Sequence, residues 1–120
     1  HGTCRRQRQM CIRDSFSGVV EEVDEGDLIA DALGDKKVII LQNHGILTTG
    51  PSVDIALWFY TSMERCCQAQ LMADAAGETQ LIPHDTAIKT RSFIANDVAA
   101  WASFQPAFDM ICKKEPDLFD

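Results

Sequence analysis

Long apolar runs are missing from this sequence of 120 residues. The longest, residues 55–60, is far shorter than the roughly 18 consecutive apolar residues that suggest a membrane-spanning helix. The basic amino terminus has no apolar stretch behind it, so no secretory signal can be read there. We therefore expect no membrane span.

Positive charge is also scarce. The chain carries 11 lysine and arginine residues against 18 aspartate and glutamate residues, which gives a net charge of −7. Because phosphate binding needs a positive face, this balance argues against nucleic acid as a main partner. It does not exclude a small anionic substrate, which needs only a local positive site.

Cysteine patterns typical of zinc fingers or disulfide frameworks are absent. The five cysteines are odd in number and irregularly spaced, without a C-x-x-C pair. The adjacent residues Cys66 and Cys67 fall in a helical pattern, so their side chains point in different directions. We interpret the cysteines as reduced, small apolar residues of a cytoplasmic protein.

What remains is the composition of an ordinary globular domain. Hydrophobic residues make up 46% of the chain and charged residues 24%, and the length allows one small domain with one core.

The first 15 residues differ from the rest. They hold four arginines against Asp14 alone, a net charge of +3, whereas residues 16–120 hold seven basic and 17 acidic residues, a net charge of −10. No period near 3.6 or 2 gives this segment a face to bury. It could be a disordered basic arm, an ordered segment without its partners, or foreign sequence, since RRQRQMCIRDS resembles translated sequencing-adaptor read-through. We assign residues 1–15 to a non-native or disordered segment and residues 16–120 to the domain.

Local signals define the elements that follow. Residues 16–23 indicate a loop or a brief edge strand. Asp24 can serve as the N-cap of a helix over residues 25–33, and Gly34 stands where a helix commonly ends.

The strongest strand signal is the run Val38-Ile39-Ile40-Leu41, within a strand expected over residues 37–42. Because this run is apolar on both faces, it is typical of a central strand covered by helices on each side. After a tight turn or bulge at residues 43–45, a second short strand is expected over residues 46–49. Two strands do not form a stable sheet alone, so the chain is predicted to be incomplete.

Helices are predicted for the carboxyl-terminal part. Ser52 can cap the longest, residues 53–76, in which apolar residues recur at steps of three and four. A second helix is expected over residues 86–94. A final aromatic-rich segment, residues 98–112, contains Pro106, which is expected to restart or kink the helix.

Only one local feature, Asn43-His44-Gly45, looks chemical. A histidine at the end of a buried strand and before a glycine is well placed to point into a cleft, since glycine lets the backbone turn. Neutral imidazole is a good zinc ligand, and the adjacent asparagine could orient a neighbouring group. By itself, a lone histidine in a turn more often has a structural role, because a zinc site needs three or four ligands.

The stretch ILQNHGILTTGPSVDIALWFYTSMERCCQAQLMADAAG resembles the class II aldolase/adducin family, in which a buried strand ends in an N-H-G or H-H-G motif before a glycine-containing turn and a long helix. The preceding FSGVVEEVDEGDLIADALGDKKVIILQNHG is similar to the family segment that leads into this motif. The resemblance covers residues 16–120. It implies an α/β fold, a partial three-layer α/β/α class II aldolase-like domain with a short β-sheet remnant followed by a long helix and C-terminal helices.

The resemblance also implies a function. His44 would be the third histidine ligand of Zn²⁺ in a parent protein that is a zinc-dependent aldehyde-lyase for small sugar or sugar-phosphate aldols. In the family, the other two ligands come from an H-x-H pair upstream and the general acid/base from a glutamate further upstream. This chain contains no H-x-H, and neither His1 nor His84 is assigned to the metal. As written, the chain is expected to be an inactive fragment.

An alternative within the same family is a non-catalytic module. Adducin-like members keep the fold without the metal site and act in binding or scaffolding, which would leave His44 with a structural role. Family members commonly form homo-oligomers, often tetramers. The aromatic residues Trp101, Phe104 and Phe108 are therefore candidates for a contact with another subunit.

Overall fold

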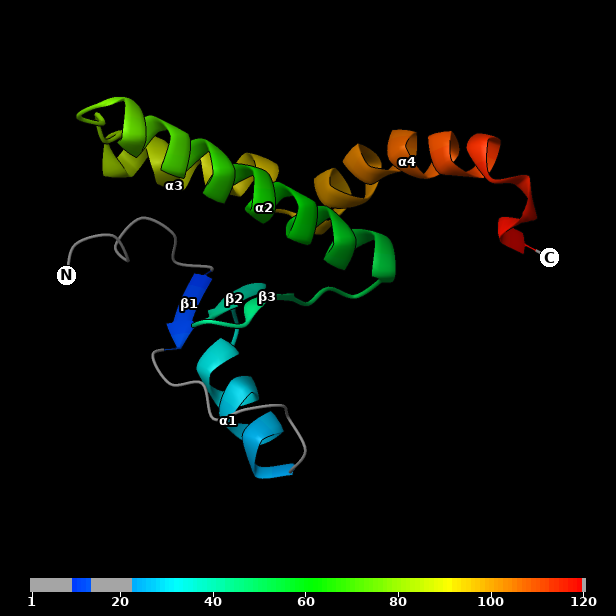
Figure 1. Ribbon diagram of the computed structural model, residues 1–120, viewed down its shortest axis with the longest axis horizontal. Helices are drawn as coiled ribbons and strands as arrows, with labels where there is room; N and C mark the ends of the chain where they lie inside the picture. Colours follow the sequence, from blue (N-terminus) through cyan, green and yellow to red (C-terminus); the bar gives the residue numbers. More distant parts are fainter. Residues whose placement is uncertain (1–9, 14–22, 120) are drawn as a thin grey trace.

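The computed structural model describes the backbone of residues 10–13 and 23–119, with side chains from residue 26 onward. Within these residues, α1 lies on one face of a small sheet and α2 on the other, so the described chain forms three layers, α/β/α (Figure 1). The elements in chain order are β1 (Met10–Arg13), α1 (Val23–Leu33), β2 (Val38–Leu41), β3 (Gly45–Thr48), α2 (Val53–Ala76), α3 (His84–Ile94), α4 (Asp97–Lys114) and the 3₁₀ helix η2 (Pro116–Phe119).

The sheet has β2 at its centre, in the order β1-β2-β3. β1 runs parallel to β2, with Met10 opposite Val38, and β3 runs antiparallel to it, with Leu41 opposite Gly45. This arrangement confirms the prediction of a central strand covered by helices on both faces.

The third strand is the difference from the sequence-based expectation. β1 lies inside residues 1–15, which we assigned to a non-native or disordered segment. Four residues with no alternating pattern carry no local strand signal, and their pairing depends on a partner 28 positions away in the chain. The loop or edge strand expected before Val23 lies outside the described residues.

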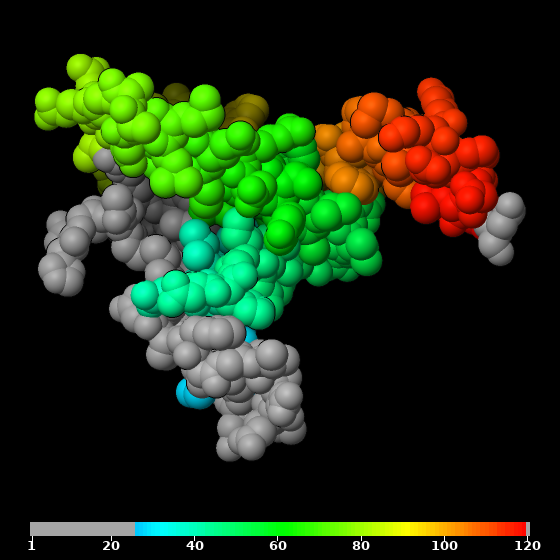
Figure 2. All heavy atoms as spheres, viewed as in Figure 1, coloured from blue at the N-terminus to red at the C-terminus, as the bar shows by residue number. Residues whose placement is uncertain are grey.

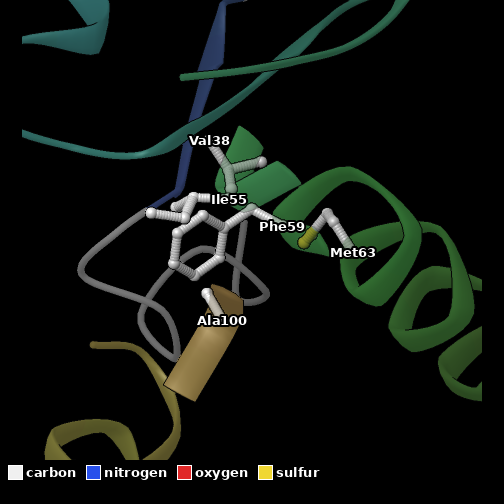
Figure 3. Close-up of a cluster of buried hydrophobic side chains, with 5 residues drawn as sticks. All are labelled: Val38, Ile55, Phe59, Met63 and Ala100. Atoms are coloured by element: carbon white, nitrogen blue, oxygen red, sulfur yellow. The ribbon is translucent and has the colours of Figure 1, made fainter. Parts of the chain in front are cut away.

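Alternation along β2 directs neighbouring side chains to opposite faces. Ile39 is fully buried, and α1, whose Ile29 is also buried, packs on that side of the sheet. Val38 belongs to the opposite face, which α2 covers. There it joins a buried cluster with Ile55, Phe59 and Met63 of α2 and Ala100 of α4 (Figure 3).

The connection into α2 is tight. A Cβ atom added to Gly50 would lie 2.9 Å from Cγ2 of Ile55 and 3.0 Å from the backbone N of Ala56, so only glycine fits without displacement. The hydroxyl of Thr48 donates to the carbonyl of Ala56 at 2.9 Å, which ties the end of β3 to the first turn of α2. Turn and helix are therefore held in one arrangement.

The helices match the sequence prediction closely. α2 spans the predicted residues 53–76. α4 is continuous through Pro106, so the helix does not restart there, although proline cannot donate the usual backbone hydrogen bond.

Lys37, directly before β2, forms an ion pair with Asp97 at the start of α4, and its Nζ lies 4.8 Å from the ring centroid of Phe59.

Candidate metal centre

The β2–β3 connection carries the candidate ligand. Leu41 and Gly45 are opposite each other in the sheet, and residues 42–44 form the turn between them. The backbone N–H of His44 donates to the carbonyl of Leu41 at 3.1 Å, which closes this turn.

The residue that permits the turn is Asn43. Its φ angle is 58°, in the left-handed region that asparagine tolerates better than most residues. Gly45, to which the sequence assigned the freedom to turn, is the first residue of β3 and has a φ angle of 158°, a conformation that side chains rarely adopt, so glycine is also required there. Asn43 and Gly45 therefore both shape the turn that carries His44.

His44 is exposed, and so are its neighbours Gln42 and Asn43. The imidazole stands at the carboxyl end of the central strand, the edge at which ligands commonly bind in open α/β sheets. A ring packed away from solvent could not serve as a metal ligand. Because His44 is exposed, this objection does not apply.

A complete ligand set is not present within the described residues. Among them, no group of three or more His, Cys, Asp or Glu side chains could hold a metal ion. His84 begins α3, whose packing partner is α4, and His1 lies outside the described residues. Because zinc sites use three or four protein ligands, the described part of this chain does not fit a whole zinc site.

The cysteines of α2 do not supply a substitute. Cys66 is exposed and Cys67 half-buried, and both are free thiols. Burial, followed by the charges of Glu64 and Cys66, raises the pKa of the Cys67 thiol above its ordinary value. Since the thiolate is the form that binds metals and attacks electrophiles, Cys67 is a poor ligand and a poor nucleophile at neutral pH.

The fold and the position of His44 define a partial α/β/α domain with a histidine at the carboxyl edge of its sheet. Residues 3–71 match the family described as Class II Aldolase and Adducin N-terminal domain. The chain belongs to the class II aldolase/adducin family. The match extends into residues 1–15 and ends within α2, so α3 and α4 lie beyond it.

Relatives in this family have different described functions. The decarboxylase NovR of Streptomyces niveus is 39% identical over 107 residues, which cover 89% of this chain and 40% of the relative. Alpha-adducin of Rattus norvegicus is 34% identical over 70 residues, which cover 56% of this chain and 10% of the relative. The relatives of this chain therefore include both a protein described as an enzyme and an adducin.

Solved structures support the same fold. L-fuculose 1-phosphate aldolase from Glaciozyma antarctica PI12 superimposes with a TM-score of 0.79 at 34% identity, over 91% of this chain and 40% of that structure. An aldolase II superfamily protein from Pseudomonas syringae has a TM-score of 0.67 at 24% identity, over 86% of this chain and 44% of that structure. The chain thus spans about 40% of the length of NovR and of the L-fuculose 1-phosphate aldolase structure. No helix within the described residues is long and apolar enough to cross a membrane.

Proposed function

We propose that this chain is part of a metal-dependent class II aldolase-like lyase, in which His44 supplies one imidazole ligand to a divalent metal. The observation that carries this proposal is the exposed imidazole of His44 at the carboxyl end of the central strand, in a closed turn. The remaining ligands and the general acid/base would come from parts of the parent protein outside this chain. Zn²⁺ is the metal that the family resemblance implies.

The chain's own contribution is to position the imidazole. The Leu41–Gly45 pair and the hydrogen bond from the His44 N–H to Leu41 fix the backbone on which the ring is mounted. A ligand carried by a strand end is held more precisely than one carried by a long loop. When bound, the metal would supply Lewis acidity toward a carbonyl oxygen of the substrate.

Small sugar or sugar-phosphate aldols are the proposed substrates of the parent. Support comes from the neighbour described as L-fuculose 1-phosphate aldolase, which has the higher TM-score of the two solved structures. The parent is proposed to be a cytoplasmic homo-oligomer, with the free thiols of Cys66, Cys67 and Cys112 supporting a reducing compartment.

This chain alone is proposed to be inactive. A metal held by one imidazole would be bound weakly, and catalysis would also lack a positioned acid/base.

The second candidate function is an adducin-like binding or scaffolding module without metal. It is supported by the similarity to alpha-adducin, which is 34% identical over the aligned residues. Under this hypothesis, His44 would bind no metal in the intact parent.

The metal content of the full-length parent distinguishes the two functions. Because imidazole binds zinc, iron, nickel and copper, all four should be measured by inductively coupled plasma mass spectrometry. We expect about one metal ion per subunit, lost in His44→Ala and retained in His84→Ala. The latter is a matched control, since His84 is also an exposed histidine.

The opposite outcomes are equally informative. A full-length protein without stoichiometric metal would favour the adducin-like module. Metal retained in His44→Ala would remove His44 from the ligand set and leave the enzymatic proposal without its supporting observation.

A further inference from the structure

Asn43 has a backbone conformation that residues with a side chain rarely adopt. Among the residues that the structure describes, it is the non-glycine residue with a positive φ angle, at 58°. A glycine at this position would form the same turn without steric conflict, because it has no Cβ atom. Non-glycine residues held in the left-handed region cluster at functional sites. The presence of an asparagine therefore needs a reason that the shape of the turn does not supply.

The side chain of Asn43 does not hold the turn together. The backbone of residues 41–45 closes the turn, by one hydrogen bond and by the pairing of its two end residues in the sheet. The Asn43 amide forms no hydrogen bond with another described residue. The side chain of Asn96, by contrast, accepts from the N–H of Ala99 and donates to the carbonyl of Phe93, at 2.8 Å in each case. The described chain thus uses the amide of Asn96 for local structure and leaves that of Asn43 available.

The Asn43 amide stands beside the candidate ligand. Consecutive Cα atoms are about 3.8 Å apart, so the side chains of Asn43 and His44 leave the backbone close together. Both residues are exposed and directly follow the carboxyl end of β2. In the space-filling view, the turquoise segment that contains this turn reaches the surface below α2 (Figure 2). A small molecule held at His44 would therefore lie within reach of the amide.

The chemistry of the amide favours one class of contact. A primary amide offers two N–H donors and a carbonyl acceptor and carries no charge. Hydroxyl groups, which also donate and accept, can bond to either end of it, whereas an anionic phosphate is better matched by a positive charge. Residues 41–45 include no lysine or arginine. The turn therefore suits the hydroxyl groups of a sugar better than its phosphate.

From these observations we propose that Asn43 is a substrate-binding residue, whose side-chain amide hydrogen-bonds a hydroxyl group of a sugar bound beside His44. The asparagine is then present for its side chain, and the left-handed backbone places that side chain next to the ligand. The inference rests on the proposed function, because it adds a residue to the same site. It also gives the site a means of selecting among sugars, since a site built to bond a hydroxyl group rejects substrates that do not present it there.

Asn43→Gly in the full-length parent tests the proposal, because glycine retains the turn and removes only the amide. The probes are the C3/C4 diastereomers of a ketohexose 1-phosphate, which differ in the orientation of their hydroxyl groups. For the preferred diastereomer we expect KM to rise about tenfold with kcat little changed, as for a lost hydrogen bond that forms equally in the ground and transition states. The preference among the diastereomers should shrink in the same variant.

Two further readouts separate a substrate contact from a structural role. The metal content of Asn43→Gly should match that of the native parent. Its urea midpoint should be equal or slightly higher, because glycine adopts a positive φ angle without steric conflict. Gln42→Ala is the matched control, since it removes another exposed amide from the preceding position of the same turn. Its KM should remain that of the native parent.

The outcomes distinguish this inference from the function on which it rests. An active, metal-loaded parent in which Asn43→Gly leaves KM unchanged would overturn the role of Asn43 alone. The same follows if Asn43→Gly loses metal or stability, or if Gln42→Ala raises KM equally. A native parent without metal would overturn the proposed function and this inference with it. One that holds metal but cleaves none of the diastereomers would overturn the substrate class on which the Asn43 contact depends.

Discussion

Gly50 shows how a single residue fixes the entry into the main helix. Its α-hydrogen faces the side chain of Ile55 and the backbone of Ala56, at distances where a methyl group does not fit. We expect Gly50→Ala to destabilise the fold by about 1–3 kcal/mol, because the buried Ile55 would have to move.

Urea denaturation followed by circular dichroism measures this change. Gly26→Ala is the control, since an added Cβ there meets nothing within 4 Å. Gly26 lies inside α1, so alanine should stabilise the chain by up to about 1 kcal/mol. A Gly50→Ala variant as stable as the native chain would show that the turn before α2 is looser than this geometry requires.

Cys67 links a single side chain to the pH dependence of stability. It packs half-buried against the apolar cluster, and burial is the main reason why its pKa is raised. The folded chain therefore holds the thiol proton more tightly than the unfolded chain does. By linkage, this contribution to stability is complete below the ordinary thiol pKa and is lost as the pH rises above it.

We expect the native chain to lose more stability than Cys67→Ala between about pH 8 and about pH 10, a window around the usual thiol pKa. Urea midpoints at several pH values measure the difference. In parallel, site-resolved alkylation should label Cys67 more slowly in the folded chain than in urea. Identical pH profiles for the two proteins would show that Cys67 does not contribute.

At the scale of elements, the two longest helices begin in different ways. The side-chain oxygen of Asn96 accepts a hydrogen bond from the backbone N–H of Ala99 at 2.8 Å at the start of α4. Ser52 stands at the N-cap of α2, where the sequence predicted a cap, but its side chain makes no capping hydrogen bond. Residue type alone predicted the position of the cap and not the bond.

This difference predicts unequal effects of two alanine substitutions. Asn96→Ala should cost about 1 kcal/mol, the usual value for a lost N-cap, and Ser52→Ala clearly less. Thermal unfolding of both variants under the same conditions measures the two values. A larger loss for Ser52→Ala would mean that its hydroxyl caps α2 in solution.

The elements also show where sequence-based prediction succeeds. The boundaries of α2 follow from the Gly-Pro-Ser break before it and Gly77 after it, so local signals were sufficient. β2 was predictable because four consecutive apolar residues indicate burial on both faces. β1 was not, since its strand structure comes from pairing with a distant segment. At the candidate site, the position of His44 in the turn after β2 was predicted, but the left-handed φ angle of Asn43 was not, because asparagine and glycine both suit such a turn.

At the scale of the whole molecule, Lys37 joins three elements that are far apart in the sequence. It precedes β2, its ammonium group pairs with Asp97 at the start of α4, and it lies over the ring of Phe59 in α2. No local sequence pattern predicts the contact between Lys37 and Asp97, which are 60 positions apart. The opposite end of β2 carries the turn with His44, so the same strand that positions the candidate ligand also fixes α4.

We expect Lys37→Met to lower the free energy of unfolding by only about 1 kcal/mol. The Asp97 side chain is 46% exposed, so solvent screens the ion pair, and a partly exposed cation–π contact adds about 0.5–1 kcal/mol. Lys36→Met is the control, because the contact of the Lys36 Nζ is a long hydrogen bond of 3.5 Å to the carbonyl of Leu33.

Salt separates the two contributions of Lys37. In urea denaturation at low ionic strength, the difference between Lys37→Met and Lys36→Met should be largest, and it should shrink in about 1 M salt, where the screening length falls to roughly 3 Å. What persists at high salt is the contact with Phe59, which is less exposed to ions because its ring is buried. A difference that does not change with salt would show that the ion pair with Asp97 contributes nothing. In that case, the Ala100 contact with α2 would have to hold α4 in place.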